Sequence, residues 1–309
     1  MIRLITTSIY IFAFLLLAGP ATVMAQDSLS VAPAAIEAAT PAPAEAVVEE
    51  VAAVLDSGNT AWILVATILV MLMTIPGLAL FYGGLVRQKN ILSIIMQCLL
   101  CVGLISILWV SFGYSWVFGT SLMESGSAWG AIIGGSDKLF FNGMTLDTLT
   151  VGNIPEILFA LFQCMFAVIT PALIIGAFAE RIKFSGFLVF TVLWAILVYN
   201  PMAHWVWGGG WMQKMGAIDF AGGTVVHINA GVSALVMAIM LGKRKDYKPG
   251  RPTTPHNITF VFMGAALLWL GWFGFNAGSG LAADGLAATA FLVPHLATSV
   301  AAMVWLAID

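Results

Sequence analysis

The chain alternates between long apolar runs and short polar segments, and the length of the runs predicts membrane-spanning helices. A helix crosses a bilayer with about 20 consecutive apolar residues. Seven runs come close to or exceed that length, so the pattern predicts an all-α polytopic membrane protein. The predicted spans cover residues 60–82, 91–118, 157–179, 186–206, 222–241, 258–275 and 286–308.

The first 57 residues follow a different pattern. Arg3 precedes an apolar stretch, and small residues in "TVMA" stand before Gln26, which is typical of a cleaved secretory signal peptide over residues 1–25. The alternative is a first membrane helix that is retained. Residues 26–57 are rich in Ala, Pro and Glu and lack a sustained apolar face. They predict a flexible extracytoplasmic leader, followed by a membrane domain over residues 58–309.

The composition is typical of a membrane protein and gives no indication of a nucleic-acid partner or a metal site. Hydrophobic residues make up 61% of the chain and charged residues 9%, whereas soluble domains carry about 25% charged residues. The net charge of −3 gives no indication of a nucleic-acid partner. Cys98, Cys101 and Cys164 lie in predicted spans, and we interpret them as buried free thiols rather than metal ligands. No cofactor is expected.

The charges of the loops alternate along the chain, and this alternation predicts the orientation of the spans. The segments 87–89, 181–183 and 243–251 hold nine Lys and Arg, whereas the other loops of the membrane domain hold only Lys138 and Lys214. Cytoplasmic loops carry an excess of basic residues. We therefore predict a multi-pass protein of the inner (plasma) membrane, with basic loops in the cytoplasm and the mature N-terminus outside. A signal peptide requires the same orientation.

One ionisable residue stands inside a predicted span. His227 lies within a stretch without charged residues from Phe220 to Gly242. Asp219 is predicted at the outer face, where it can cap the following helix. At 1.5 Å per residue, His227 would then lie about 12 Å deeper. An ionisable group inside the membrane is a candidate functional residue. The alternative for His227 is a packed polar side chain that bonds a neighbouring carbonyl. His295 is the rival intramembrane histidine, and it follows Pro294 and could act as a partner at a helix kink.

Aromatic and small residues gather near the same outer face. Trp207, Phe275 and Ser279 are predicted there, and Phe166 lies at a depth between Asp219 and His227. Each has a simpler interpretation: an interfacial aromatic for Trp207, core packing for the two Phe, and a helix end for Ser279. The glycine-rich stretches "WGGGW", "FAGGT" and "FNAGSG" permit close helix packing and irregular backbone around a cavity. Together these residues favour an outer vestibule.

Several long motifs of the chain match one family in the same order. They cover Asp56–Asn90 ("DSGNTAWILV…GGLVRQKN"), Phe162–Phe184 ("FQCMFAVITPALIIGAFAERIKF"), Ala203–Gly210 ("AHWVWGGG"), Gly216–Gly231 ("GAIDFAGGTVVHINAG"), Pro255–Asn257 ("PHN") and Gly271–Gly280 ("GWFGFNAGSG"). On these residues the chain resembles the ammonium transporter family, the Amt/Mep/Rh superfamily, and within it the Amt branch. The resemblance implies eleven helices in two inverted five-helix halves, assembled as a homotrimer with one pore in each subunit. About seven of the eleven spans are present.

The resemblance also implies roles for individual residues. Phe166, Trp207 and Ser279 match the outer site that recruits ammonium, and Asp219 matches the acidic residue beside that site. Phe166 and Phe275 match the stacked aromatic gate beneath the recruitment site.

Two further residues match the pore below the gate. His227 matches the first of two pore histidines, and Trp272 matches an aromatic residue that lines the pore. The implied function is a non-enzymatic one: ammonium binds outside, loses a proton near the gate and passes His227 as ammonia, with separate transfer of the proton.

The chain also departs from the family pattern. It stops at Asp309, so we expect a C-terminal truncation that removes the second pore histidine and the tail through which PII-type regulators act. Val293 and Pro294 stand where the family usually has Asn and Thr, which puts the local helix geometry in question.

Three other functions remain as alternatives. An ammonium sensor would use the same fold and signal through a missing C-terminal region. A Rh-like gas channel is disfavoured by Trp207 and the motif "DFAGGTVVHINAG". An intramembrane enzyme is disfavoured because the spans contain no H-E-x-x-H, paired aspartates or G-x-S-x-G.

Overall fold

The structure is a computed structural model that describes residues 53–120, 122, 126–244, 247–250 and 254–308. The predicted signal peptide and nearly all of the predicted leader lie outside these residues. Regular structure in the described part is helical apart from β1 (Leu149–Thr150) and β2 (Ile154–Pro155). These two-residue strands pair antiparallel, with Leu149 opposite Pro155, immediately before the third span.

Seven helical segments of the described chain are long and apolar enough to cross a membrane, which confirms the predicted all-α polytopic architecture. They agree with the predicted spans within a few residues, except that the fourth continues to Lys214. The spans are Ser57–Leu85, Gln88–Phe118, Glu156–Phe178, Phe184–Lys214, Gly223–Leu241, Ile258–Gly278 and Gly285–Ile308.

The first, second, fourth and fifth spans are built from shorter helices. The first contains α2 (Ser57–Leu72), η1 (Met73–Leu78) and α3 (Ala79–Leu85); the second contains η2 (Gln88–Asn90), α4 (Ile91–Leu108), η3 (Trp109–Gly113) and α5 (Tyr114–Phe118). The fourth contains α7 (Phe184–Trp194), η7 (Ala195–Tyr199), α8 (Asn200–Trp207) and α9 (Trp211–Lys214). The fifth contains η8 (Gly223–Ile228) and α10 (Asn229–Leu241).

The remaining spans are single helices, and short turns fill one long loop. These spans are α6 (Glu156–Phe178), α11 (Ile258–Gly278) and α12 (Gly285–Ile308). The turns η4 (Ala128–Ala131), η5 (Leu139–Phe141) and η6 (Val151–Asn153) lie between the second and third spans. Each of the four composite spans contains a π-helical turn: η1, η3 and η7 interrupt the first, second and fourth spans, and η8 begins the fifth. Such turns are rare and occur frequently at functional sites.

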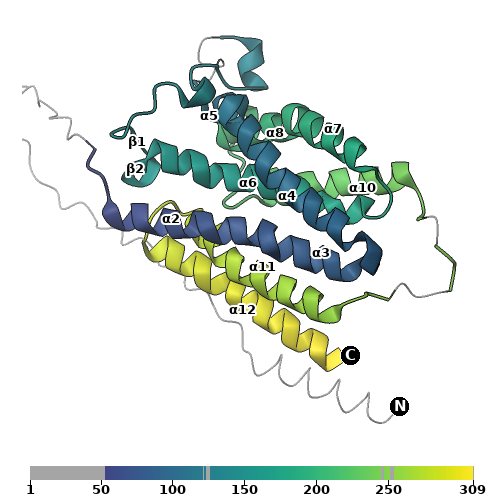
Figure 1. The fold of residues 1–309 in the computed structure, drawn as a ribbon. Coiled ribbons are helices and arrows are strands. Elements are labelled where there is room, and N and C mark those ends of the chain that lie inside the picture. The colour runs from purple at the N-terminus through teal and green to yellow at the C-terminus, as the bar shows by residue number, and fades with distance from the viewer. Residues whose placement is uncertain (1–52, 121, 123–125, 245–246, 251–253, 309) are drawn as a thin grey trace, which may run out of the picture. The chain divides into compact units, whose positions relative to one another are not determined.

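The core is organised around α6. It contacts α2, α4 and α10, and Figure 1 shows it between α2 and α4. Because α6 is enclosed on several sides, its sequence is apolar nearly all round. Two donors from neighbouring spans bond its carbonyls: buried Trp109 Nε1 donates to Ala160 O at 2.9 Å, and half-buried Tyr82 Oη donates to Leu173 O at 2.9 Å. The central helix is therefore held in place along its length.

Glycines on one face of α11 bring its backbone against α2. A Cβ atom on Gly274 would lie 2.7 Å from the carbonyl oxygen of Ala66, and one on Gly271 would lie 2.6 Å from that of Leu69. Small residues permit such close approach. Trp62 Nε1 of α2 also donates to the Ala277 carbonyl of α11 at 3.3 Å. The two helices therefore pack with their backbones nearly in contact.

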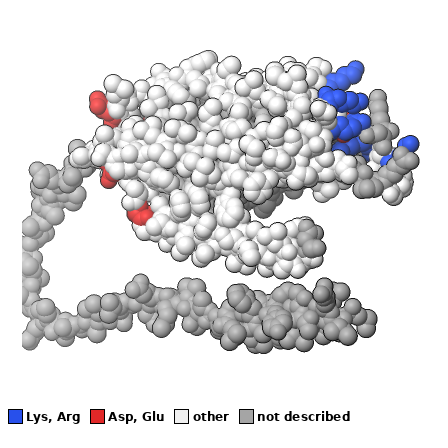
Figure 2. Space-filling model, turned by 60° about the horizontal axis from the view of Figure 1, so that its bottom comes forward, with Lys and Arg blue, Asp and Glu red and all other residues white. Residues whose placement is uncertain are grey.

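Charged side chains separate to opposite ends of the described helices, as Figure 2 shows for Lys and Arg against Asp and Glu. At the basic end, the Glu180 carboxylate accepts hydrogen bonds from the backbone N and Nε of Arg87 and from Asn90 Nδ2. Arg244 Nη1 lies 3.4 Å from its other oxygen. At the acidic end, Lys138 Nζ lies 3.0 Å from Glu156 Oε2. Glu180 thus joins three basic segments that are distant in sequence.

The three cysteines are buried and free, which confirms their interpretation as packed thiols. Cys98 and Cys101 lie in α4, and Cys164 lies in α6 with its Sγ 3.6 Å from Ser106 Oγ. Within the described residues, no group of three or more His, Cys, Asp or Glu is arranged to hold a metal ion.

Candidate functional site

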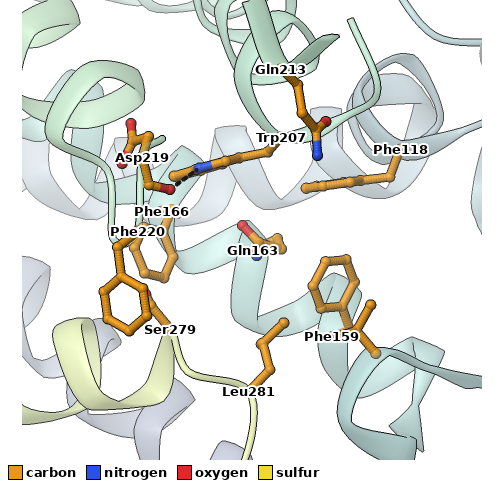
Figure 3. A pocket seen from close by; sticks show the side chains of 11 residues that line it. Phe118, Phe159, Gln163, Phe166, Trp207, Gln213, Asp219, Phe220, Ser279 and Leu281 are labelled. Carbon is orange, nitrogen blue, oxygen red and sulfur yellow. Dashed lines mark hydrogen bonds between the residues drawn. The ribbon is translucent and has the colours of Figure 1, made fainter. Parts of the chain in front are cut away.

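A cavity of about 210 Å³ lies where α5, α6, α8 and α11 approach one another. Its walls carry four of the residues singled out from the sequence, Phe166, Trp207, Asp219 and Ser279, and also Gln163. Figure 3 shows these side chains converging on one space. The structure therefore brings together residues from the third, fourth and sixth spans and from the segment before the fifth.

Phe166 and Trp207 form one side of this cavity, and Phe275 packs behind Phe166. The ring centroids of Phe166 and Phe275 lie 4.5 Å apart at an interplanar angle of 33°, and both side chains are 1% exposed. Trp207 stands nearly perpendicular to Phe166, with centroids 5.9 Å apart. Offset and edge-to-face pairs at such distances are the favoured aromatic geometries. The aromatic side of the cavity is therefore well packed.

The phenyl pair separates this cavity from a second one. The second cavity has a volume of about 390 Å³, and Phe275, Trp272 and His227 line it. Phe166 lines only the first cavity, whereas Phe275 lines only the second. The two cavities also share Asp219 and Phe220 as wall residues, so they adjoin one another on either side of the ring pair.

Asp219 acts as a cap at the start of η8. Its Oδ1 accepts hydrogen bonds from the backbone N–H of Gly222 and Gly223, and its Oδ2 accepts from Thr224 and Val225, at 2.6–2.9 Å. The predicted cap is therefore confirmed. A carboxylate at this position compensates the partial positive charge of a helix N-terminus. Both carboxylate oxygens are therefore engaged by backbone N–H groups.

The cap also shows where the helix that carries His227 begins. The helix begins at Gly223, after Gly222 adopts a left-handed conformation with φ of 96°. His227 is therefore four residues inside the helix, and residues 219–222 precede it, whereas the predicted depth of about 12 Å assumed a helix from Asp219 onward.

His227 is oriented by the π-helical turn. Its Nδ1 lies 3.0 Å from the carbonyl oxygen of Gly222, five residues earlier. A carbonyl only accepts, so a neutral imidazole in this position donates through Nδ1 and keeps Nε2 as an acceptor. The ring packs at 5.6 Å from Trp272 and 5.7 Å from Phe275. The histidine thus stands beside the phenyl pair, on the wall of the second cavity.

Trp207 and Ser279 are held by backbone carbonyls. Trp207 Nε1 donates to the carbonyl oxygen of Asp219 at 2.9 Å. Ser279 Oγ donates to the carbonyl oxygen of Phe275 at 2.8 Å, and Ser279 is the C-cap residue of α11. Both side chains nevertheless face the first cavity. Ser279 therefore ends a helix and Trp207 is a packed aromatic residue, and both still line the candidate site.

The rival histidine lies elsewhere. The ring of His295 packs against the rings of Trp269 and Phe273 of α11, at 5.5 and 5.8 Å, and it lines neither cavity. α12 continues from Gly285 to Ile308 through Pro294. We therefore assign His295 to helix packing in place of a role at a kink.

Gln163 and His204 are among the polar residues near the site that escaped the sequence analysis. Gln163 lies three residues before Phe166 in α6 and lines the first cavity. His204 of α8 is fully buried, and its ring nitrogens face the carbonyl oxygens of Val117 and Gly130 at 2.9 and 3.0 Å. Their only sequence signal was a polar side chain inside an apolar span. His204 connects α8 to α5 and η4, close to Trp207.

The fold and this site define a polytopic helical membrane protein with an aromatic cavity at one end, bordered by a buried ring pair. A family model described as the Ammonium Transporter Family matches residues 61–309, and the chain belongs to this family.

Individual relatives agree with this membership. An ammonium transporter of Bacillus subtilis is 48% identical over 256 residues, which cover 82% of this chain and 60% of that protein. The crystal structure of Candida albicans Mep2 matches with a TM-score of 0.65 and 38% identity, over 74% of this chain and 49% of that one. A structure described as a sensor Amt protein matches with a TM-score of 0.66 and 33% identity, over 75% and 56%. The chain thus spans about half to three fifths of the length of these relatives.

Proposed function

We propose that the protein transports ammonium across the membrane. Ammonium binds in the first cavity, loses a proton at the phenyl pair and continues as ammonia past His227. The observation that carries this proposal is the buried Phe166–Phe275 pair. It stands between a cavity lined by aromatic rings and a cavity that contains a histidine.

The first cavity suits a small cation that donates hydrogen bonds. The faces of Trp207 and Phe166 attract cations, by about 0.5–1 kcal/mol when exposed and about 2 kcal/mol or more when water is excluded. The Ser279 hydroxyl uses its hydrogen for the Phe275 carbonyl, so its lone pairs remain available to accept from ammonium. Asp219 adds negative potential, although four backbone N–H groups compensate most of it.

The phenyl pair gives selectivity. Hydrated ions such as sodium do not fit between two stacked apolar rings, and a constriction of this kind excludes them. Potassium is close to ammonium in size, but it has no proton to release. A path that only the neutral molecule completes therefore rejects potassium. We propose that Phe166 and Phe275 form the gate of this path.

His227 and Trp272 line the path beyond the gate. With Nδ1 donating to the Gly222 carbonyl, Nε2 is the atom that accepts a hydrogen bond from ammonia or receives the released proton. We propose that the proton travels separately from ammonia, with His227 as the first group of its relay. Trp272 packs on the imidazole and fixes its ring plane.

The placement of charge supports the predicted orientation. Glu180 gathers Arg87 and Arg244 at one end of the helices, and we propose that this end faces the cytoplasm. The first cavity then opens to the outside of the inner (plasma) membrane, where the mature N-terminus also lies. The family membership further supports nitrogen uptake, assembly as a homotrimer, and regulation of the whole protein by a PII-type partner.

A second function is supported by one comparison. The similarity to the sensor Amt protein favours an ammonium sensor with the same recruitment site as the alternative proposal. A sensor binds ammonium and changes the activity of an attached or associated domain, with little flux. Ammonium-evoked current in vesicles that contain only this protein separates the two functions.

The experiment that tests transport substitutes His227 in the protein reconstituted in liposomes. For His227→Ala we expect the ammonium current to fall about 100-fold, because a positioned proton acceptor contributes about 10²–10⁴-fold. The measurement is the current after an ammonium or potassium concentration jump. His295→Ala is the matched control, since His295 is also in a membrane span but lines neither cavity. Unchanged current and unchanged selectivity against potassium in His227→Ala would contradict the proposed role.

A further inference from the structure

The first cavity contains five polar side chains that carry hydrogen-bonding groups, and four of them are already engaged within the protein. Asp219 accepts from four backbone N–H groups, Trp207 and Ser279 donate to carbonyls, and Gln213 Oε1 accepts from the Gly209 N–H at 2.7 Å. The fifth is Gln163, whose side-chain amide makes no hydrogen bond among the described residues. A half-buried polar group without a partner is costly unless water or a ligand supplies one.

Gln163 is also placed where a bound cation would lie. It belongs to α6, the most enclosed span, and is one turn before Phe166. Figure 3 shows its amide group pointing toward the space between Trp207 and Phe166. Because neither end of the amide is tied to the protein, the group is free to rotate and present its oxygen to that space.

We infer that Gln163 is a further residue of the ammonium recruitment site, where its Oε1 accepts a hydrogen bond from the bound ion. This inference rests on the proposed function. Ammonium donates in four tetrahedral directions, and the rings of Trp207 and Phe166 satisfy it only through their faces. Oxygen acceptors from Gln163 of α6 and from Ser279 at the end of α11 would meet two further directions.

A neutral acceptor suits this position better than an acidic one. The amide oxygen attracts the cation by its dipole but adds no charge that would hold ammonium back from releasing its proton. Gln163 therefore sets the affinity for the ion, while the phenyl pair and His227 act on the later steps. Its replacement by an apolar residue should change the half-saturating concentration and leave the maximal current nearly unchanged.

The test measures ammonium-evoked currents in proteoliposomes as a function of ammonium concentration. In Gln163→Leu we expect the half-saturating concentration to rise roughly tenfold. This factor corresponds to the lower end of the range for one hydrogen bond to a charged group. In Gln163→Glu we expect it to fall several-fold, since the carboxylate adds an attractive charge. The opposite signs keep the test informative if one variant folds poorly.

Gln213→Leu is the matched control, because Gln213 lines the same cavity but its amide oxygen is occupied by Gly209. Its half-saturating concentration should stay within about twofold of the unsubstituted protein. Unchanged half-saturation in both Gln163 variants, with currents present, would overturn this inference and leave the proposed function intact. No current in the unsubstituted protein would overturn the proposed function and the inference with it.

Discussion

Replacing Asp219 with Asn separates a structural role of its carboxylate from a direct role in ion binding. Asn keeps one oxygen, which can accept two of the four backbone hydrogen bonds at the start of η8. Its NH₂ group replaces the other oxygen and faces two N–H donors with no acceptor. The substitution therefore removes two bonds and leaves the size of the side chain almost unchanged.

The structure gives the size of the expected effect. A hydrogen bond to a charged group contributes about 1.5 kcal/mol at the lower end, which is appropriate for a half-buried carboxylate. Two lost bonds correspond to about 3 kcal/mol of local stability, or about 100-fold in the opening equilibrium. Hydrogen exchange of the Gly222–Val225 amides should accelerate by that factor, because exchange reports local opening. Mass spectrometry of peptides that cover this segment measures it.

Asp284→Asn provides the control for this prediction. Asp284 Oδ1 accepts from one backbone N–H, that of Ala287, at 2.9 Å, and Asn retains that oxygen. Exchange at the start of α12 should therefore change by less than about fivefold. If Asp219→Asn leaves exchange near η8 unchanged and weakens ammonium binding, the carboxylate acts on the ion and the structural reasoning is refuted.

Two further predictions concern the packing of the helices and the ties between the basic loops. Gly274→Ala places a Cβ 2.7 Å from the Ala66 carbonyl oxygen and should destabilise the protein by about 1–3 kcal/mol. Gly231→Ala is the control and should not destabilise it, because a Cβ there meets nothing within 4 Å. Thermal unfolding in detergent compares the two variants. Burial raises the pKa of Glu180, but hydrogen bonds from Asn90 and Arg87 and the charge of Arg87 outweigh it and hold the pKa below its usual value of 4.5. Glu180 therefore stabilises the fold above pH 4.5, and this contribution is lost as the pH falls through the lowered pKa. Glu180→Gln should lower the melting temperature at pH 7 and should lose less stability than the unsubstituted protein when the pH is lowered. An equal fall of the melting temperature with pH in the variant and the unsubstituted protein would contradict this prediction.

The sequence predicts the spans well because the membrane restricts what can stand in them. Backbone groups in lipid must be satisfied within a helix, and charged side chains are expelled to the loops. Charge-free runs therefore mark spans almost directly, as in Gly223–Leu241 and Gly285–Ile308. The internal division of these spans is different, because π-helical turns such as η8 depend on contacts with other helices.

The candidate site was only partly accessible from the sequence, for a related reason. Asp219 was identifiable as a cap from its position before an apolar run. The start of the helix at Gly223 was not, since it depends on the left-handed Gly222 and on one carboxylate reaching four amides. Gln163 gave no clear signal, because a glutamine in a span is informative only when its hydrogen-bond partners are known.

The contact between α11 and α2 has a consequence for how the proposed gate can open. Phe275 and Ser279 lie one turn apart on α11, so the ring at the constriction and the oxygen at the entrance move together. The glycine face leaves α11 little freedom to slide along α2, which opposes gating by a shift of the whole helix. On the proposed function, the gate would then open by rotation of the Phe166 and Phe275 side chains within a backbone that stays fixed, and the packing around these buried rings would set how often they rotate.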